Sequence, residues 1–217
     1  MSREVYALLL DHLGIDRAAV LAYSAGSASA LELALRRPGR VLGLVLANAR
    51  LGGPTQQAAQ AHPEHGVRLG APVWLYRALL PSLYARMVGI PKGYQAIPED
   101  LATIRAVSEL QFPLRPRSVA QSSTVRVQPG RRPVPFEELT VPTLIVSATD
   151  DPWARHHYAA AAAGRIPGAK LVTIDRGGPL FLSHDAQVRT ATGGFLEPVA
   201  QPERRPTWVV ASHTWTS

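Results

Sequence analysis

The sequence predicts an α/β protein with a mostly parallel sheet flanked by helices and interrupted by an inserted helical segment. Two observations carry this prediction. Strand-like and helix-like segments alternate at both ends of the chain, as they do in βαβ units. The run at 41–47 is continuously apolar instead of alternating, which is typical of a parallel strand covered on both faces.

The front of the chain predicts two helices and two strands. Val5, Leu8, Leu9 and Leu13 recur at three- and four-residue spacing, which indicates an amphipathic helix. Gly14 follows them in the place of a helix-ending residue with left-handed backbone. The elements expected here are this helix, a strand over 18–22, a helix over 27–37 that Pro38-Gly39 ends, and a strand over 41–47.

The regular alternation stops after residue 50 and resumes near residue 139. A strand over 142–146, a helix over 156–165, a strand over 170–174 and a helix over 186–195 then follow. The expected organisation is a first part of the core at 1–50, a helical cap at 51–138, a second part of the core at 139–196 and a C-terminal tail at 197–217. The tail has no clear period and is expected to be loosely docked or disordered.

Composition limits the classes of partner. The net charge is +7, but almost all of the positive charge is arginine scattered along the chain, which favours a solvated surface over nucleic-acid binding. The absence of cysteine excludes disulfides and thiolate metal sites. The sequence shows neither a signal peptide nor an apolar stretch of membrane-spanning length, so we expect a cytoplasmic protein without membrane association.

The most informative motif is Ala22-Tyr23-Ser24-Ala25-Gly26, which lies between a short apolar run and a stretch of small helix-forming residues. A nucleophilic serine is displayed on such a strand-to-helix turn. Small neighbours matter there because strand and helix pack closely, and a bulky side chain would clash. The residues on either side of Ser24, from Ala22 to Gly26, include three small ones: Ala22, Ala25 and Gly26.

Further motifs follow in a fixed order: Val-Pro-Thr-Leu-Ile-Val at 141–146, Asp150-Asp151-Pro152, Ile-Pro-Gly-Ala at 166–169, and Arg-Gly-Gly at 176–178. Together with the serine turn, this set resembles the α/β-hydrolase family over about residues 4–196.

The resemblance implies a doubly wound sheet with Ser24 as nucleophile, Asp151 as the acid of a catalytic triad and the backbone N–H of Ala25 as an oxyanion donor. Asp150 stays open as the alternative acid. The implied reaction is acyl transfer from an ester or related bond to water through an acyl-serine, with no cofactor and no metal. The expected substrate is a small apolar ester, because the cap carries an apolar surface at helical spacing between Trp74 and Met87.

Similar chains carry the catalytic histidine directly after the Gly-Gly pair, where this sequence has Pro179. Proline has no ionisable side chain and cannot accept the proton of Ser24. His184 is the nearest substitute, and we interpret it as a helix-start or loop residue. His156 and His157 are adjacent on a helix, so at most one could face the site. A last pair of histidines, in the segment 62–65, is interpreted as part of a cap loop.

The first strand of this chain lies directly before the serine turn, whereas similar proteins have several strands before it. We therefore expect an open flank beside the strand at 18–22, and we interpret Met1 as an internal methionine of a longer ancestral frame. With Pro179, this predicts an impaired hydrolase. The alternative is a non-catalytic relative that binds an apolar small molecule or a protein partner. The sequence leaves the oligomeric state open.

Overall fold

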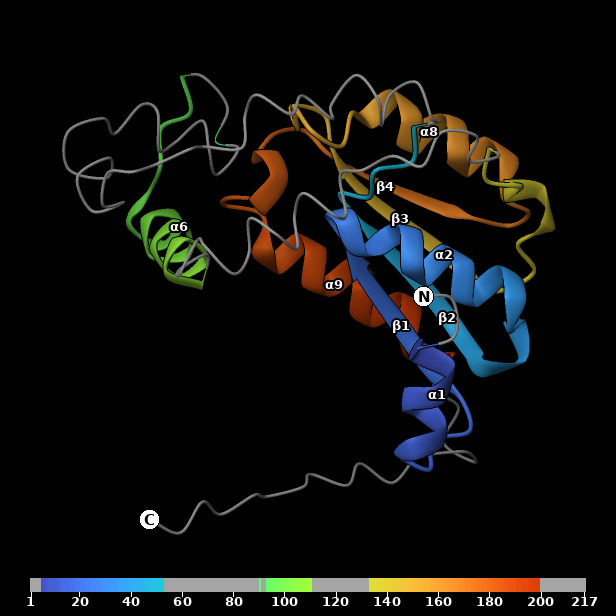
Figure 1. Ribbon diagram of the computed structural model, residues 1–217. Helices are drawn as coiled ribbons and strands as arrows, with labels where there is room; N and C mark the ends of the chain where they lie inside the picture. Colours follow the sequence, from blue (N-terminus) through green and yellow to red (C-terminus); the bar gives the residue numbers. More distant parts are fainter. Residues whose placement is uncertain (1–4, 53–89, 91–92, 111–132, 200–217) are drawn as a thin grey trace, which may run out of the picture.

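The computed structural model describes residues 5–52, 90, 93–110 and 133–199 (Figure 1). Its sheet has four strands, all parallel, in the order β1-β2-β3-β4. The strands are β1 (Ala18–Tyr23), β2 (Val41–Ala47), β3 (Thr143–Ala148) and β4 (Lys170–Ile174). The helices are α1 (Val5–His12), α2 (Ser27–Arg36), α6 (Pro98–Leu110), α8 (His156–Arg165) and α9 (Asp185–Leu196).

The predicted order of helices and strands is confirmed in the parts of the core that the structure describes. The bounds of β2, β4 and α8 are as predicted, and those of the other predicted elements agree to within about two residues. Gly14 follows α1 with φ +65, the left-handed conformation expected for it. Most of the predicted cap, its apolar helical surface and the tail from residue 200 lie outside the described residues.

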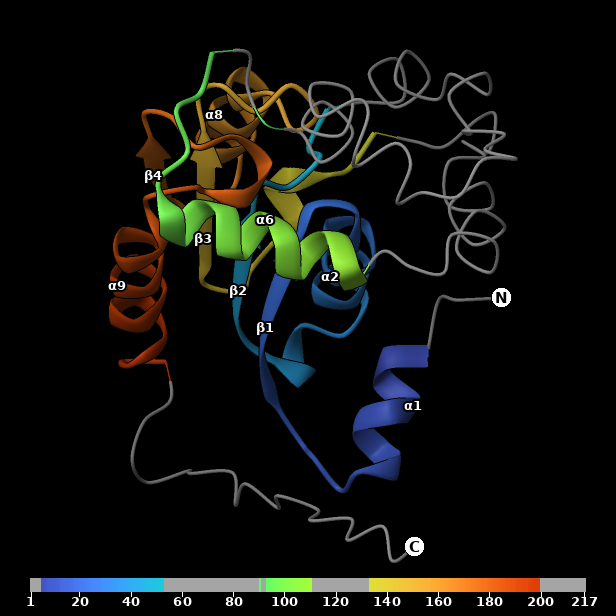
Figure 2. The same cartoon turned by 90° about the vertical axis from the view of Figure 1, so that its left-hand side faces the viewer.

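Helices cover both faces of the sheet. Along β2, successive side chains point to opposite faces and pack against different helices. Leu44 and Leu46 of β2 pack in one hydrophobic cluster with side chains of α2 and α8. Val45 and Ala47, the residues between and after them, pack in a second cluster that includes Phe195 of α9. Figures 1 and 2 show the same division, with α2 and α8 on one side and α9 on the other. This two-sided burial explains why the β2 sequence is continuously apolar.

Gly43 lets the end of α9 approach the sheet. A Cβ at this position would lie 3.1 Å from Val199 Cγ1 and 3.4 Å from Phe195 Cε1, which is tighter than ordinary van der Waals contact. A larger residue in the middle of β2 would therefore push the C-terminal helix away from the strand.

The carboxyl ends of the four parallel strands meet at one edge of the sheet, where the loops that carry the predicted site residues begin. β1 leads to Ser24, β2 to Asn48, β3 to Asp150 and Asp151, and β4 to the loop with Pro179. Sites in open α/β sheets form outside the carboxyl ends of the strands.

Candidate active site

Ser24 lies at the bend between β1 and α2. Its φ is +49, a left-handed conformation that non-glycine residues rarely adopt. A single 3-10 turn, Ser24–Gly26, follows, and Ser27 then begins α2. The Ser27 hydroxyl donates a hydrogen bond of 2.6 Å to the Ser24 carbonyl and so ties the start of the helix to the bend. The backbone at Ser24 has the strained geometry that displays a side chain between a strand and a helix.

The small residues around the bend behave differently from one another. Ala22 is buried. Gly26 has φ −64, and none of the described residues lies within 4 Å of where its Cβ would be. Within the described part of the chain, a side chain at Gly26 would therefore meet no close neighbour. Ala25, the predicted oxyanion donor, is exposed in the middle of that turn.

Asp151 is buried, with 4% of its surface exposed. Its Oδ1 accepts hydrogen bonds from the backbone N–H groups of Trp153 (2.7 Å) and Ala154 (2.9 Å). Burial raises the pKa of Asp151, these two bonds lower it in part, the charge of Asp150 adds to the rise, and the Arg50 guanidinium opposes it. The fold thus holds this carboxylate in a fixed position at a cost in solvation.

Asp150 has a different set of partners. Its Oδ1 accepts a hydrogen bond from Gly178 N (2.9 Å) and its Oδ2 accepts one from Gly177 N (3.2 Å). Both donors belong to the loop after β4. The two neighbouring carboxylates therefore accept hydrogen bonds from different segments of the chain. Asp150 fixes a loop, whereas the described backbone donors to Asp151 use only Oδ1.

Asn48 fixes the same loop from the other side. It has φ +40, is 1% exposed, and its Nδ2 donates to the carbonyls of Gly178 and Pro179, each at 3.0 Å. Its Oδ1 accepts a 3.0 Å hydrogen bond from Ala148 N at the end of β3. Our sequence analysis missed this residue. The available signal was a polar residue directly after a continuously apolar strand, of a type that tolerates left-handed backbone.

Comparisons with known proteins identify the family and the fold. A profile of the alpha/beta hydrolase family matches residues 2–191. The chain belongs to this family. A curated relative from Cupriavidus pinatubonensis, a 2-hydroxy-6-oxononadienedioate/2-hydroxy-6-oxononatrienedioate hydrolase, is 29% identical over 175 residues, which are 78% of this chain and 58% of the relative. The chain thus spans well under two thirds of that relative's length.

Solved structures of other proteins have the same fold. A thermophilic esterase from Thermogutta terrifontis is 22% identical, with a TM-score of 0.61, over 89% of this chain and 70% of the esterase. The enol-lactonase from Burkholderia xenovorans is also 22% identical, with a TM-score of 0.56, over 89% of this chain and 69% of the lactonase. At this level of identity the likeness extends to the alpha/beta hydrolase fold alone.

The charge of Asp151 after β3 influences titratable groups at the ends of β1 and β2. Burial raises the pKa of Tyr23 to about 12, an interaction with Asn48 opposes the rise, and the charge of Asp151 adds to it. Because Tyr23 is 40% exposed overall, we attribute this burial to its hydroxyl end. Burial lowers the pKa of Arg50, and Asp151 opposes that change. The charge of Asp151 therefore acts on the residue directly before Ser24.

Pro179 lies in a short 3-10 turn, Gly178–Leu180, that continues from Gly177. Gly177 has φ +118, and a Cβ there would lie 2.7 Å from the Leu182 carbonyl oxygen. Phe181, which follows the turn, packs edge-on against Tyr23 with ring centroids 6.2 Å apart. The loop that contains Pro179 therefore lies next to the end of β1.

None of the hydrogen bonds among the described residues joins a histidine to Ser24 or Asp151. His184 precedes α9 and its Nδ1 lies 3.2 Å from Gln187 Oε1. His156 and His157 begin α8, where the ring of His157 packs against that of Tyr158. The segment 62–65 lies outside the described residues. Among the described residues, none of the helices combines the length and the hydropathy that a membrane span requires.

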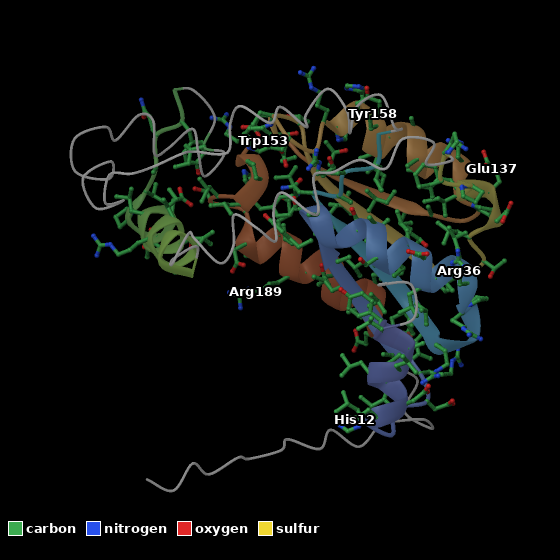
Figure 3. All side chains as sticks on the ribbon, in the orientation of Figure 1. His12, Arg36, Glu137, Trp153, Tyr158 and Arg189 are labelled. Carbon is green, nitrogen blue, oxygen red and sulfur yellow. The ribbon has the colours of Figure 1, made fainter. Side chains whose placement is uncertain are left out.

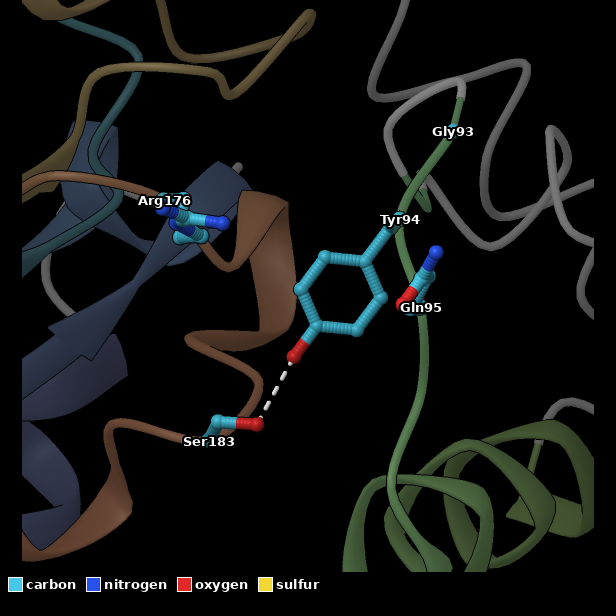
Figure 4. Close-up of a pocket in the computed structure, with 5 residues that line it drawn as sticks. All are labelled: Gly93, Tyr94, Gln95, Arg176 and Ser183. Atoms are coloured by element: carbon cyan, nitrogen blue, oxygen red, sulfur yellow. Dashed lines mark hydrogen bonds between the residues drawn. The ribbon is translucent and has the colours of Figure 1, made fainter.

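A second group of polar residues joins the segment at the start of α6 to the residues that follow β4. A cavity of about 560 Å³ is lined by Gly93, Tyr94, Gln95, Arg176 and Ser183 (Figure 4). The Tyr94 hydroxyl lies 2.9 Å from Ser183 Oγ and donates to Asp100 Oδ2 at 2.8 Å. Ser183 also donates to Asp100 through its N–H (2.6 Å) and its hydroxyl (2.7 Å). These bonds attach the start of α6 to the loop before α9, and the cavity is lined by none of the predicted catalytic residues.

Proposed function

We propose that this alpha/beta hydrolase is built for serine hydrolysis of an ester or related acyl bond, and that its turnover is impaired. In this proposal Ser24 is the nucleophile, Asp151 the acid of the triad and the Ala25 N–H an oxyanion donor. The observation that carries it is the left-handed backbone of Ser24 at the strand-to-helix bend. The buried Asp151 at the same edge of the sheet supports it, because its charge reaches Tyr23.

The chemistry assigns a task to each group. The Ser24 hydroxyl oxygen attacks the acyl carbon, the carbonyl oxygen becomes an oxyanion, and the Ala25 N–H donates to it. The C–O bond to the leaving group then breaks, the alcohol leaves with the proton that Ser24 has lost, and water hydrolyses the acyl-serine to the acid and free Ser24. Asp151 would hold a histidine in the correct tautomer and would stabilise the imidazolium that forms when the histidine takes the serine proton. Asp150 is the weaker candidate for this task, because both of its oxygens bind the loop at Gly177 and Gly178.

Impairment follows from the missing proton acceptor. With Pro179 in the histidine position, the serine proton has no base in the described site. Loss of the triad histidine lowers turnover by on the order of 10⁶, which corresponds to about 8 kcal/mol of transition-state stabilisation.

Labelling of Ser24 by a fluorophosphonate tests the proposal. Substituting Pro179→His should raise the labelling rate by about 100-fold, the lower end of what a positioned general base contributes. Pro179→Ala is the matched control, because it removes the ring without adding a base. The added label should disappear in the double variant Pro179→His, Ser24→Ala. If the folded Pro179→His protein labels no faster than Pro179→Ala, then the site is not assembled for acyl transfer.

The second candidate function is a non-catalytic member of the fold that binds an apolar small molecule or a protein partner. The proline at position 179 is the observation that favours it. This candidate predicts that Pro179→His and Ser24→Ala label at the same slow rate.

The curated relative's activity on a dienedioate supports hydrolysis as the broad class of reaction for this chain. The small apolar substrate and the cytoplasmic location stay predictions.

A further inference from the structure

The cavity that contains none of the proposed catalytic residues lies between two segments of the described chain. Gly93, Tyr94 and Gln95 form one side of it, and Arg176 and Ser183 form the other (Figure 4). Its volume of about 560 Å³ is within the range of sites for small molecules, roughly 300–1,000 Å³. None of these residues belongs to α1 or β1, so the cavity does not depend on how the sheet continues beyond its first strand.

Asp100 joins the two sides of the cavity. It is 3% exposed and accepts hydrogen bonds from both sides. Ser183 donates through its N–H (2.6 Å) and its hydroxyl (2.7 Å), and the segment before α6 donates through the Tyr94 hydroxyl (2.8 Å) and the Ile97 N–H (3.2 Å). Burial opposes ionisation of Asp100, but these bonds outweigh it and lower its pKa. The carboxylate is therefore charged at neutral pH, and the bonds that fix both sides lie within the described residues.

The hydroxyls of Tyr94 and Ser183 can only accept further hydrogen bonds. Their oxygens lie 2.9 Å apart, and each lies within 2.8 Å of Asp100 Oδ2. Both hydroxyl protons are thus used within this group of oxygens, and only lone pairs remain for a ligand. Burial raises the pKa of Tyr94, the contact with Ser183 opposes the rise, and Asp100 and the charge of Asp150 add to it. A ligand group that meets these hydroxyls must therefore donate hydrogen bonds, and a positive charge on it is favoured.

Arg176 contributes the opposite charge to the same cavity. Its guanidinium carries several N–H donors and stays charged at any ordinary pH. None of the ion pairs and hydrogen bonds in the described chain uses this side chain, so its donors are open to a ligand. A guanidinium binds a carboxylate through two parallel hydrogen bonds. The cavity therefore offers a site for a carboxylate as well as a site for a cationic donor.

We propose that this cavity binds a small amino carboxylate, with the carboxylate on Arg176 and the ammonium group on the hydroxyls of Tyr94 and Ser183. A zwitterion matches both groups at once. A simple carboxylate leaves the two hydroxyl acceptors unmatched, and a simple amine leaves the guanidinium unpaired. The proposal does not depend on the proposed function, because binding is measured without any turnover.

A chemical-shift titration of the purified 217-residue chain with γ-aminobutyrate tests the proposal. We expect saturable binding with a dissociation constant of about 1 mM, because the ligand is small and water screens the exposed Arg176. Glycine and β-alanine carry the same two groups closer together, so saturable binding of any of these zwitterions supports the proposal. Butyrate lacks the ammonium group and butylamine lacks the carboxylate, and each should bind at least about 10-fold more weakly.

Two arginine variants locate the carboxylate. Arg176→Gln should raise the dissociation constant of the tightest zwitterion by at least about 10-fold, because it removes the charge and the paired donors. Arg189→Gln is the matched control. Arg189 is also exposed, but it projects from α9 (Figure 3) and pairs with Asp185, so its loss should leave binding unchanged. Ser24→Ala should also bind as the natural chain does, since Ser24 does not line the cavity.

Tyr94→Phe examines the ammonium end. It removes a hydroxyl acceptor and keeps the ring, so it should weaken γ-aminobutyrate but not butyrate. The absence of saturable binding by any zwitterion up to about 50 mM would overturn the proposal. Equal dissociation constants for Arg176→Gln and Arg189→Gln would overturn it as well. Butyrate that binds as tightly as γ-aminobutyrate would show a site for anions alone, and loss of binding in Ser24→Ala would place the ligand in the proposed active site; either result contradicts the proposal.

Discussion

Asn48→Ala should be among the most destabilising single substitutions in the described core. The substitution leaves Ala148 N and the Gly178 carbonyl without their buried partner, at about 1–2 kcal/mol each. The left-handed backbone, φ +40, adds about 1 kcal/mol for alanine. The Pro179 carbonyl is partly exposed and can bind water, so we count nothing for it. The expected loss is about 3–5 kcal/mol, a large share of the roughly 5–15 kcal/mol that stabilises a domain.

Urea unfolding followed by circular dichroism measures this loss as a change in the free energy of unfolding. Asn48→Gly separates the two causes, because glycine removes the hydrogen bonds but accepts the left-handed backbone, and it should be about 1 kcal/mol more stable than Asn48→Ala. Ser147→Ala is the control. Ser147 is as buried as Asn48, but its hydroxyl has no hydrogen-bond partner among the described residues, so its loss should be below about 1 kcal/mol. A loss of less than about 1 kcal/mol for Asn48→Ala would refute the reasoning.

Two further outcomes are expected from the loops around the site. Gly177→Ala should lower the free energy of unfolding by about 3 kcal/mol or more, because its Cβ would lie 2.7 Å from a backbone oxygen, whereas Gly14→Ala, with φ +65 and open surroundings, should lose only about 1 kcal/mol. Desolvation opposes ionisation of Asp100, but hydrogen bonds from Ser183, Tyr94 and Ile97 outweigh it and lower its pKa. The charged form therefore contributes stability above the ordinary carboxyl pKa and loses it as the pH falls through the lowered value. Asp100→Asn should be less stable than the natural chain at pH 7, and the difference should vanish in acid; a difference that is constant with pH in urea unfolding would contradict this assignment.

Much of the core could be predicted because its signals are local. The continuous apolar run of β2 reflects cover by helices on both faces, and Gly14 reflects a left-handed helix end. The prediction of α1 as an amphipathic helix is confirmed as to the helix, but its apolar face is exposed in the described structure. Periodicity specifies which side chains share a face and does not specify what covers that face.

The contacts that hold the site loops and the second polar group join residues far apart in the sequence, and the sequence does not reveal such contacts. Asn48 bonds to residues 100, 130 and 131 positions away, and Asp100 bonds to Ser183, 83 positions away. No local pattern distinguishes such a residue from an ordinary loop asparagine or a helix-capping aspartate. The separate tasks of Asp150 and Asp151 also needed coordinates, because adjacent carboxylates look alike in a sequence.

The way in which the loop after β4 is held has a consequence for how this chain can change. Asp150 and Asn48 bind only main-chain atoms of this loop. Asp150 accepts hydrogen bonds from the N–H groups of Gly177 and Gly178, and Asn48 donates to the carbonyls of Gly178 and Pro179. The side chain at position 179 takes no part in these bonds. A substitution at position 179 can therefore change the side chain offered to the site while the four hydrogen bonds that hold the loop are kept.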